Sequence, residues 1–144
     1  MIEETVTARL ERAHLLDHPT TPLLWVVLDE AVLRRKTGGP VVMAEALWHM
    51  AELIRKHRVI VQVLPFSAGG HAAMISALKL MAFTDAPSLA YIEGPEMGLL
   101  EDGPAIVARH ALAYDLVGAS ALSPQDSLAL IESVAEDYAH EDQP

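Results

Sequence analysis

The stretch Val59-Ile60-Val61-Gln62-Val63-Leu64 is the clearest structural signal in the chain, because it is a run of β-branched and apolar residues that ends at Pro65. A second apolar run of strand length, Leu-Leu-Trp-Val-Val-Leu, occupies residues 23–28. Neither run alternates apolar with polar residues, which is typical of strands covered on both faces. The sequence therefore predicts two interior strands, and helices to cover them.

Segments with helical spacing surround these two strands. Apolar residues recur there every three or four positions, and proline often stands at the first helical position. The predicted helices span residues 3–16, 29–35, 40–57, 104–118 and 123–138. Residues 77–83 and 88–93 read as the strands of a hairpin, with residues 84–87 as its turn. We expect one α/β (α+β) domain over residues 1–144, with a mixed sheet of about four strands, covering helices, a C-terminal helical pair and a polar tail over 140–144.

Composition narrows the classes of function. The chain has 10 Lys and Arg against 20 Asp and Glu, and this net charge of −10 disfavours direct nucleic-acid binding, which depends on basic residues that neutralise phosphates. The absence of Cys excludes disulfides, thiolate catalysis and thiolate metal sites. No apolar stretch approaches the ~20 residues of a membrane span, and the acidic N-terminus does not resemble a secretory signal. We expect a cytoplasmic protein that does not bind membranes.

The apolar content is high for a chain of this size. Apolar residues make up 51% of the sequence and the mean hydropathy is +0.25. A face buried in a homodimer, or a cavity for a hydrophobic ligand, would explain the surplus. For a two-fold homodimer, the commonest soluble oligomer, we expect contacts through the helix of residues 40–57 or through the C-terminal helical pair.

His71 is the histidine whose position best suits a functional site. It follows the bend Ser67-Ala68-Gly69-Gly70 just beyond a predicted interior strand, where ligand sites on open sheets tend to form. Ser67 resembles a nucleophile elbow only faintly, because Pro65 stands where that motif has Gly, and a turn residue is the preferred interpretation. The two glycines would suit either a backbone anion site or a plain loop, and the loop is preferred.

Acidic and aromatic residues complete the candidate site. An imidazole titrates near neutral pH, so His71 suits acid-base catalysis with Glu93 or Asp29 as its orienting carboxylate. The candidate ligand-binding residues are Trp25, Ser67, Gly70, His71 and Glu93.

The histidine spacing does not favour a metal site. His14 and His18 are four residues apart, which would suit a divalent metal if one helix carried both. Asp17 and Pro19 indicate that the helix ends before His18, and the other histidines lack ligand spacing. We therefore expect neither a metal nor a cofactor.

Several motifs, taken in order, resemble one known family. They are Leu24-Trp25-Val26-Val27-Leu28-Asp29-Glu30-Ala31-Val32-Leu33-Arg34-Arg35, Gly38-Gly39-Pro40-Val41-Val42-Met43, Val59-Ile60-Val61-Gln62-Val63-Leu64-Pro65-Phe66, Ala68-Gly69-Gly70-His71-Ala72, Tyr91-Ile92-Glu93, and Leu122-Ser123-Pro124 with Ser127. Over residues 3–138 the chain is similar to the C-terminal effector domain of actinomycete XRE-type helix-turn-helix regulators, which are antitoxin-like transcriptional regulators. The resemblance implies a regulatory role.

The chain also departs from that family. Members usually carry a DNA-binding helix-turn-helix before this domain, whereas here Met1 stands almost at the start of the domain, so we expect a free-standing copy without a DNA-binding head. In the first helix, this chain has Arg12-Ala13 where family members often have Arg-Gln. After His71, it has Ile75-Ser76-Ala77-Leu78 where family members usually have a Gly-rich stretch that contains Phe.

Two functional hypotheses follow. The first is a regulatory module that binds a hydrophobic small molecule or a partner protein and does not bind DNA alone. The second is a cofactor-free enzyme, an isomerase or cyclase that acts on a hydrophobic natural-product intermediate held in a reactive conformation. Only the second hypothesis makes His71, Glu93 and Asp29 catalytic, and it needs neither a nucleophile nor a metal.

Overall fold

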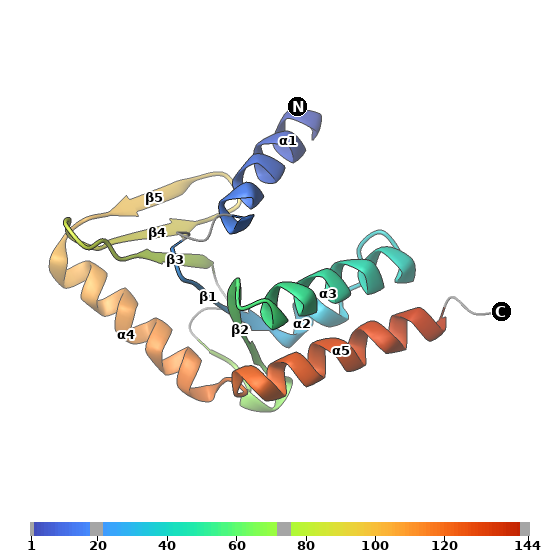
Figure 1. Cartoon of the computed structure of the whole chain (residues 1–144). Coiled ribbons are helices and arrows are strands. Elements are labelled where there is room, and N and C mark those ends of the chain that lie inside the picture. Colours follow the sequence, from blue (N-terminus) through green and yellow to red (C-terminus); the bar gives the residue numbers. More distant parts are fainter. Residues whose placement is uncertain (1, 18–21, 72–75, 142–144) are drawn as a thin grey trace. The chain divides into compact units, whose positions relative to one another are not determined.

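The computed structural model describes residues 2–17, 22–71 and 76–141 (Figure 1). The elements in chain order are α1 (Ile2–Ala13), the 3₁₀ turn η1 (His14–Asp17), β1 (Leu24–Asp29), α2 (Glu30–Arg34), α3 (Pro40–Arg55), β2 (Val59–Leu64), the 3₁₀ turn η2 (Phe66–Ala68), β3 (Ala77–Met81), β4 (Leu89–Glu93), β5 (Gly98–Glu101), α4 (Pro104–Ser120) and α5 (Pro124–Glu141).

The contacts divide the chain into two compact units. The first unit comprises residues 1–26, 32–61 and 124–144, and the second comprises 27–31 and 62–123. Whether they fold as the single domain expected over residues 1–144 stays a prediction.

β1 and β2 form a two-stranded parallel sheet. Parallel neighbours require a crossover connection, which α2 and α3 supply here. β2 has the bounds that its β-branched run predicts, and Val61, Val63 and Leu64 are almost completely buried. β1 does not meet the expectation of an interior strand, because Leu24 and Trp25 are 43% and 51% exposed. The apolar run is long enough for a strand, but among the described residues β2 is the strand that pairs with it, and the first two residues of β1 stay exposed.

The core of the first unit lies between α3 and α5, which run side by side (Figure 1). Leu47 of α3 and Ile131 and Val134 of α5 are buried there, as their helical spacing predicts, and Ala51 of α3 is buried as well. The hydroxyl of buried Tyr138 donates a hydrogen bond to the carbonyl of Leu33 at 3.0 Å. This hydrogen bond joins the end of α2 to α5.

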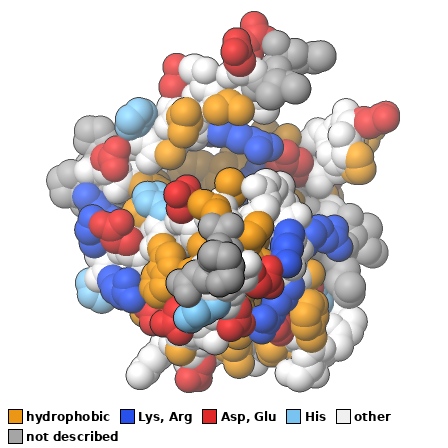
Figure 2. All heavy atoms as spheres, turned by 90° about the vertical axis from the view of Figure 1, so that its right-hand side faces the viewer, with side chains coloured by type: hydrophobic (Ala, Val, Ile, Leu, Met, Phe, Trp, Pro, Cys, Tyr) orange, Lys and Arg blue, Asp and Glu red, His pale blue; other side chains and the backbone are white. Residues whose placement is uncertain are grey.

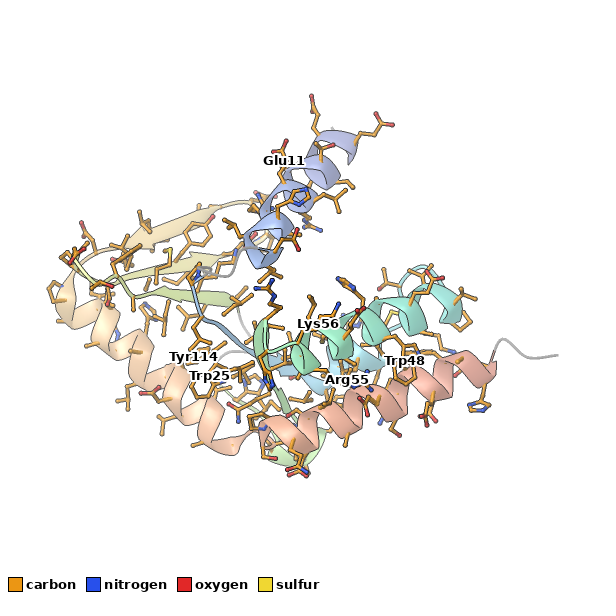
Figure 3. All side chains as sticks on the ribbon, in the orientation of Figure 1. Glu11, Trp25, Trp48, Arg55, Lys56 and Tyr114 are labelled. Atoms are coloured by element: carbon orange, nitrogen blue, oxygen red, sulfur yellow. The ribbon has the colours of Figure 1, made fainter. Side chains whose placement is uncertain are left out.

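Charged side chains border the helix pair on its solvent side. Arg55 pairs with Glu132 across α3 and α5, and Figure 3 labels Arg55 on α3. Lys36 Nζ lies 2.5 Å from a carboxylate oxygen of Glu141. Ion pairs at this level of exposure contribute little to stability, so the apolar core carries the packing of α3 on α5.

The first helix does not bury its apolar stripe in the way its amphipathic spacing predicts. Val6 and Leu10 are 50% and 62% exposed. The helix ends at Ala13 and continues as η1, where the backbone carbonyl of Asp17 accepts a hydrogen bond from Arg58. A helical period shows that one face is apolar, but it does not show that the face has a partner.

The second unit contains an antiparallel sheet of β3, β4 and β5, with α4 packed against β3 and β4. Lys79 pairs with Tyr91 in the register of β3 and β4, and Glu93 pairs with Gly98 in that of β4 and β5. The predicted hairpin is therefore present, and β5 is a third strand that the sequence did not predict. A Cβ on Gly98 would lie 1.8 Å from the hydroxyl oxygen of Tyr91, so the tyrosine ring occupies the space that glycine leaves open.

The expected class, mixed α/β with C-terminal helices, is confirmed. The strands are divided between the parallel pair and the antiparallel sheet of three rather than joined in one sheet. Within the described residues, no helix is both long and apolar enough to cross a membrane.

Candidate functional site

The carboxyl ends of β1 and β2 lie at the same edge of the parallel pair, because parallel strands run in the same direction. Asp29 is the last residue of β1, and η2 begins two residues after the end of β2. Open sheets commonly bind ligands at this edge. We define the candidate site as the edge cluster: Asp29, Glu30, Phe66 and His71, all within the second unit.

Asp29 caps the short helix α2. Its Oδ1 accepts a hydrogen bond from the backbone N–H of Ala31 at 2.8 Å, which is the usual geometry for an acid before the first helical residue. This bond, followed by a hydrogen bond with His71, lowers the pKa of Asp29 from its ordinary value of 3.8. Asp29 is therefore ionised at neutral pH and acts only as an acceptor.

His71 is held by the other carboxylate oxygen of Asp29. Its Nε2 lies 3.1 Å from Asp29 Oδ2, and the side chains of His71 and Asp29 are 15% and 32% exposed. Because the ionised carboxylate cannot donate, Nε2 carries the hydrogen of this bond. In the neutral ring Nδ1 then bears a lone pair, so the arrangement sets the histidine tautomer.

The Nδ1 atom of His71 is buried and has no hydrogen-bond partner in the part of the chain that the structure describes. An unmet buried acceptor typically costs a fold about 1–3 kcal/mol. Such atoms are uncommon in native proteins and often belong to functional sites. Nδ1 of His71 is therefore the most distinctive atom of the edge cluster.

The loop that carries His71 is anchored at its start. The backbone N–H of Phe66 donates to Glu30 Oε2 at 2.9 Å, so the residue after Asp29 holds the residue at the start of η2. Gly69 then turns the chain with a φ of +75°, a conformation that favours glycine. Asp29, the last residue of β1, and Glu30, the residue after it, therefore hold both ends of the loop, through His71 and Phe66 respectively.

The remaining predicted site residues are placed as follows. Glu93 pairs with Lys79 at 2.5 Å, and among the described residues the hydrogen bonds of His71 lead to Asp29 instead. Ser67 and Gly70 are exposed in the loop between Phe66 and His71. Trp25 lies in β1 and belongs to the first unit.

Sequence reasoning missed Glu30 and Phe66. Glu30 follows Asp29 directly, but it reads as an ordinary acid in the first turn of a helix. The role of Phe66 is carried by its backbone N–H, which has no signal in the sequence. Only the pairing of β1 with β2 brings these two residues to one edge.

A shallow apolar hollow lies elsewhere in the second unit. It has a volume of about 430 Å³ and is lined by Phe83, Ala86, Pro87, Leu89 and Asp102. It is open to solvent and does not include His71, so it does not form part of the edge cluster.

The candidate metal ligands lie in the first unit. Nδ1 of His14 is 3.1 Å from Asp17 Oδ2, and both side chains are well exposed. His18 lies outside the described residues, as do Ala72 and Ile75 of the family-like motifs. Within the described residues, no three His, Asp or Glu side chains are grouped closely enough to hold a metal ion.

Comparison with known proteins identifies a family whose description states no function. No curated protein and no solved structure shows significant similarity to the chain. A family model described as "Domain of unknown function (DUF5753)" matches residues 1–133 of the 144 residues. Because this match spans most of its length, the chain belongs to the DUF5753 family.

Proposed function

We propose that the chain is a regulatory module that binds a hydrophobic small molecule or a partner protein at the edge cluster. The observation that carries the proposal is the buried Nδ1 of His71, which lies beside an oriented Asp29 and has no hydrogen-bond partner among the residues that the structure describes. A ligand that donates a hydrogen bond to Nδ1 would satisfy this acceptor and recover the free energy that its burial costs. The preferred ligand therefore has an apolar body and one hydroxyl or N–H donor.

The family-like motifs support a regulatory context for this module. In this proposal the chain acts in the cytoplasm as an effector domain of the kind found in actinomycete XRE-type, antitoxin-like regulators. The net charge of −10 argues against binding nucleic acid on its own. Figure 2 shows both acidic and basic side chains on the face that it draws.

Phenol and anisole provide a matched pair of probes for the ligand site. Both have an apolar ring, but only phenol can donate a hydrogen bond. Titration followed by amide NMR should show phenol shifting the signals of residues 66–71, with anisole binding more weakly. His71→Phe should abolish the difference between the probes, whereas His110→Ala, a histidine of α4 in the same unit, should preserve it.

Two outcomes would contradict ligand binding at His71. One is equal binding of phenol and anisole to the wild-type chain. The other is an unchanged preference for phenol in His71→Phe.

The second candidate function is a cofactor-free isomerase or cyclase for a hydrophobic natural-product intermediate. The same hydrogen bond favours it, because Asp29 would stabilise the imidazolium that forms when Nδ1 removes a proton from a substrate. This role needs no nucleophile. Asp29 rather than Glu93 is the orienting carboxylate here, since Glu93 is paired with Lys79.

Proton exchange would test this role directly. Hydrophobic intermediates made by enzymes encoded beside the gene would be incubated in deuterated water and examined by mass spectrometry. Asp29→Asn and His71→Ala should remove enzyme-dependent deuterium uptake and product formation, while Glu93→Gln should leave both unchanged. Absence of uptake and turnover with the wild-type chain would contradict the enzyme and favour the regulatory module.

A further inference from the structure

Helix α4 has an unusual composition for a helix with an exposed face. In the 17 residues of Pro104–Ser120, the Asp, Glu, Lys and Arg side chains are limited to Arg109 and Asp115. A helix that is apolar on all sides is normally buried on all sides. Yet Leu112 and Leu116 are 59% and 62% exposed, in a chain whose net charge is −10.

One face of α4 is already used within the second unit. The helix packs against β3 and β4, and Val107 is 7% exposed on that side. Its exposed face, called here the α4 stripe, is defined by Ala105, Ala108, Arg109, Leu112, Asp115, Leu116 and Ala119. At 100° per residue these seven positions fall within about 120° of the helix circumference, with Leu112 at their centre.

The α4 stripe is self-complementary about Leu112. If a second helix ran antiparallel with a two-fold axis beside Leu112, Ala119 of the partner would stand level with Ala105, and Leu116 of the partner level with Ala108. Asp115 of the partner would stand level with Arg109, and the reciprocal pair would form by symmetry. The small alanines would allow the two helices to approach closely, and the two leucines would fill the seam.

We propose that the α4 stripe is the interface of a two-fold homodimer in which two copies of α4 pack antiparallel. A parallel arrangement would set Arg109 level with Arg109 and Asp115 level with Asp115, and like charges at that position repel. Within the described residues neither side chain takes part in an ion pair, so both are available to a second copy. The interface is independent of the ligand site proposed at His71.

Sedimentation equilibrium of the wild-type chain and of two leucine variants tests the surface. The wild type should have twice the monomer mass of 15.6 kDa, and Leu112→Lys should be a monomer with an unchanged circular-dichroism spectrum. Leu10→Lys is the matched control, because Leu10 of α1 is as exposed as Leu116, and it should remain a dimer. A monomeric wild type, or a dimer broken by Leu10→Lys but not by Leu112→Lys, would overturn the proposal.

A charge exchange tests the antiparallel geometry separately. Arg109→Asp and Asp115→Arg should each weaken dimerisation roughly tenfold, because the two-fold axis removes two attractive pairs at once. The double variant restores both pairs with reversed sign and should dimerise nearly as well as the wild type. If the double variant instead loses as much dimer affinity as the two single variants together, the antiparallel pairing is wrong. It is also wrong if neither single variant changes the dimer affinity. If the wild type is a monomer and Leu112→Lys lowers its thermal stability, the α4 stripe packs within the chain. That result would also contradict the dimer.

Discussion

Replacing Asp29 with Asn keeps the shape of the side chain but removes its charge, and it should reverse the hydrogen bond to His71. The Asn oxygen can still accept the N–H of Ala31 and cap α2. Its amide group would then face Nε2 of His71, and an amide N–H only donates. His71 would therefore change tautomer, with Nε2 as the acceptor and Nδ1 as the donor. The buried acceptor of the edge cluster would be lost without loss of the fold.

The expected loss of stability is modest. Asn and Asp are about equally good caps, so the bond to Ala31 contributes little to the difference. The bond to His71 changes from charge-assisted to neutral, which amounts to about 1–1.5 kcal/mol for a buried bond. Because the Asp29 side chain is 32% exposed, screening by solvent reduces this, and we expect Asp29→Asn to lower the free energy of unfolding by about 1 kcal/mol.

Urea unfolding at several pH values would test this estimate. The pKa of Asp29 is lowered in the folded chain, first by the Ala31 N–H and then by His71. The charge of Asp29 therefore stabilises the fold at any pH above its ordinary pKa of 3.8, and this contribution is lost as the pH falls through the lower pKa of the folded chain. The wild type should therefore be more stable than Asp29→Asn at neutral pH, and the difference should shrink below 3.8. Asp85→Asn, an exposed acid between β3 and β4, is the control. No difference at neutral pH, or one that is unchanged in acid, would refute this reasoning.

Three further substitutions test the packing by urea unfolding. Gly98→Ala should destabilise the second unit by about 1 kcal/mol or more, because the new Cβ collides with the Tyr91 ring, and unchanged stability would contradict that packing. Tyr138→Phe should lower the free energy of unfolding by about 1–3 kcal/mol, since it leaves the Leu33 carbonyl without its buried donor; a neutral effect would mean that water replaces the hydroxyl. His57→Gly should raise that free energy by about 0.5–1 kcal/mol, because His57, two residues after the end of α3, has a φ of +55°, and a destabilised variant would show that the imidazole contributes more than the backbone strain.

The elements that the sequence predicted best have sharp chemical boundaries. Val59–Leu64 is β-branched and ends at a proline, and it forms β2 with those bounds. Proline at position 124 likewise begins α5, in which Ile131, Val134 and Tyr138 of the predicted apolar stripe are buried. These boundaries depend on local backbone preferences, which a sequence states directly.

The features that the sequence missed depend on neighbours. β5 has four residues, three of them exposed, so it shows no alternation, and only pairing with β4 identifies it as a strand. The apolar run of β1 did not reveal that the first two residues of the strand, Leu24 and Trp25, would be exposed. In the same way, the position and chemistry of His71 predicted it as a site residue, with either Asp29 or Glu93 as its orienting carboxylate. The choice of Asp29 depends on the pairing of β1 with β2 and could not be made from spacing.

The most direct measurement is the protonation of the His71 ring nitrogens by long-range ¹H–¹⁵N correlation NMR. The signals would be assigned by their loss in His71→Phe, and the spectrum recorded at a pH of about 9, well above the ordinary pKa of a histidine side chain. We predict one tautomer, with the hydrogen on Nε2 and a bare Nδ1, and the opposite tautomer in Asp29→Asn. Exposed His49 should show the mixture expected in water. A hydrogen on Nδ1 of wild-type His71, or a solvent-like mixture, would contradict an acceptor set by Asp29 and with it the proposed ligand site.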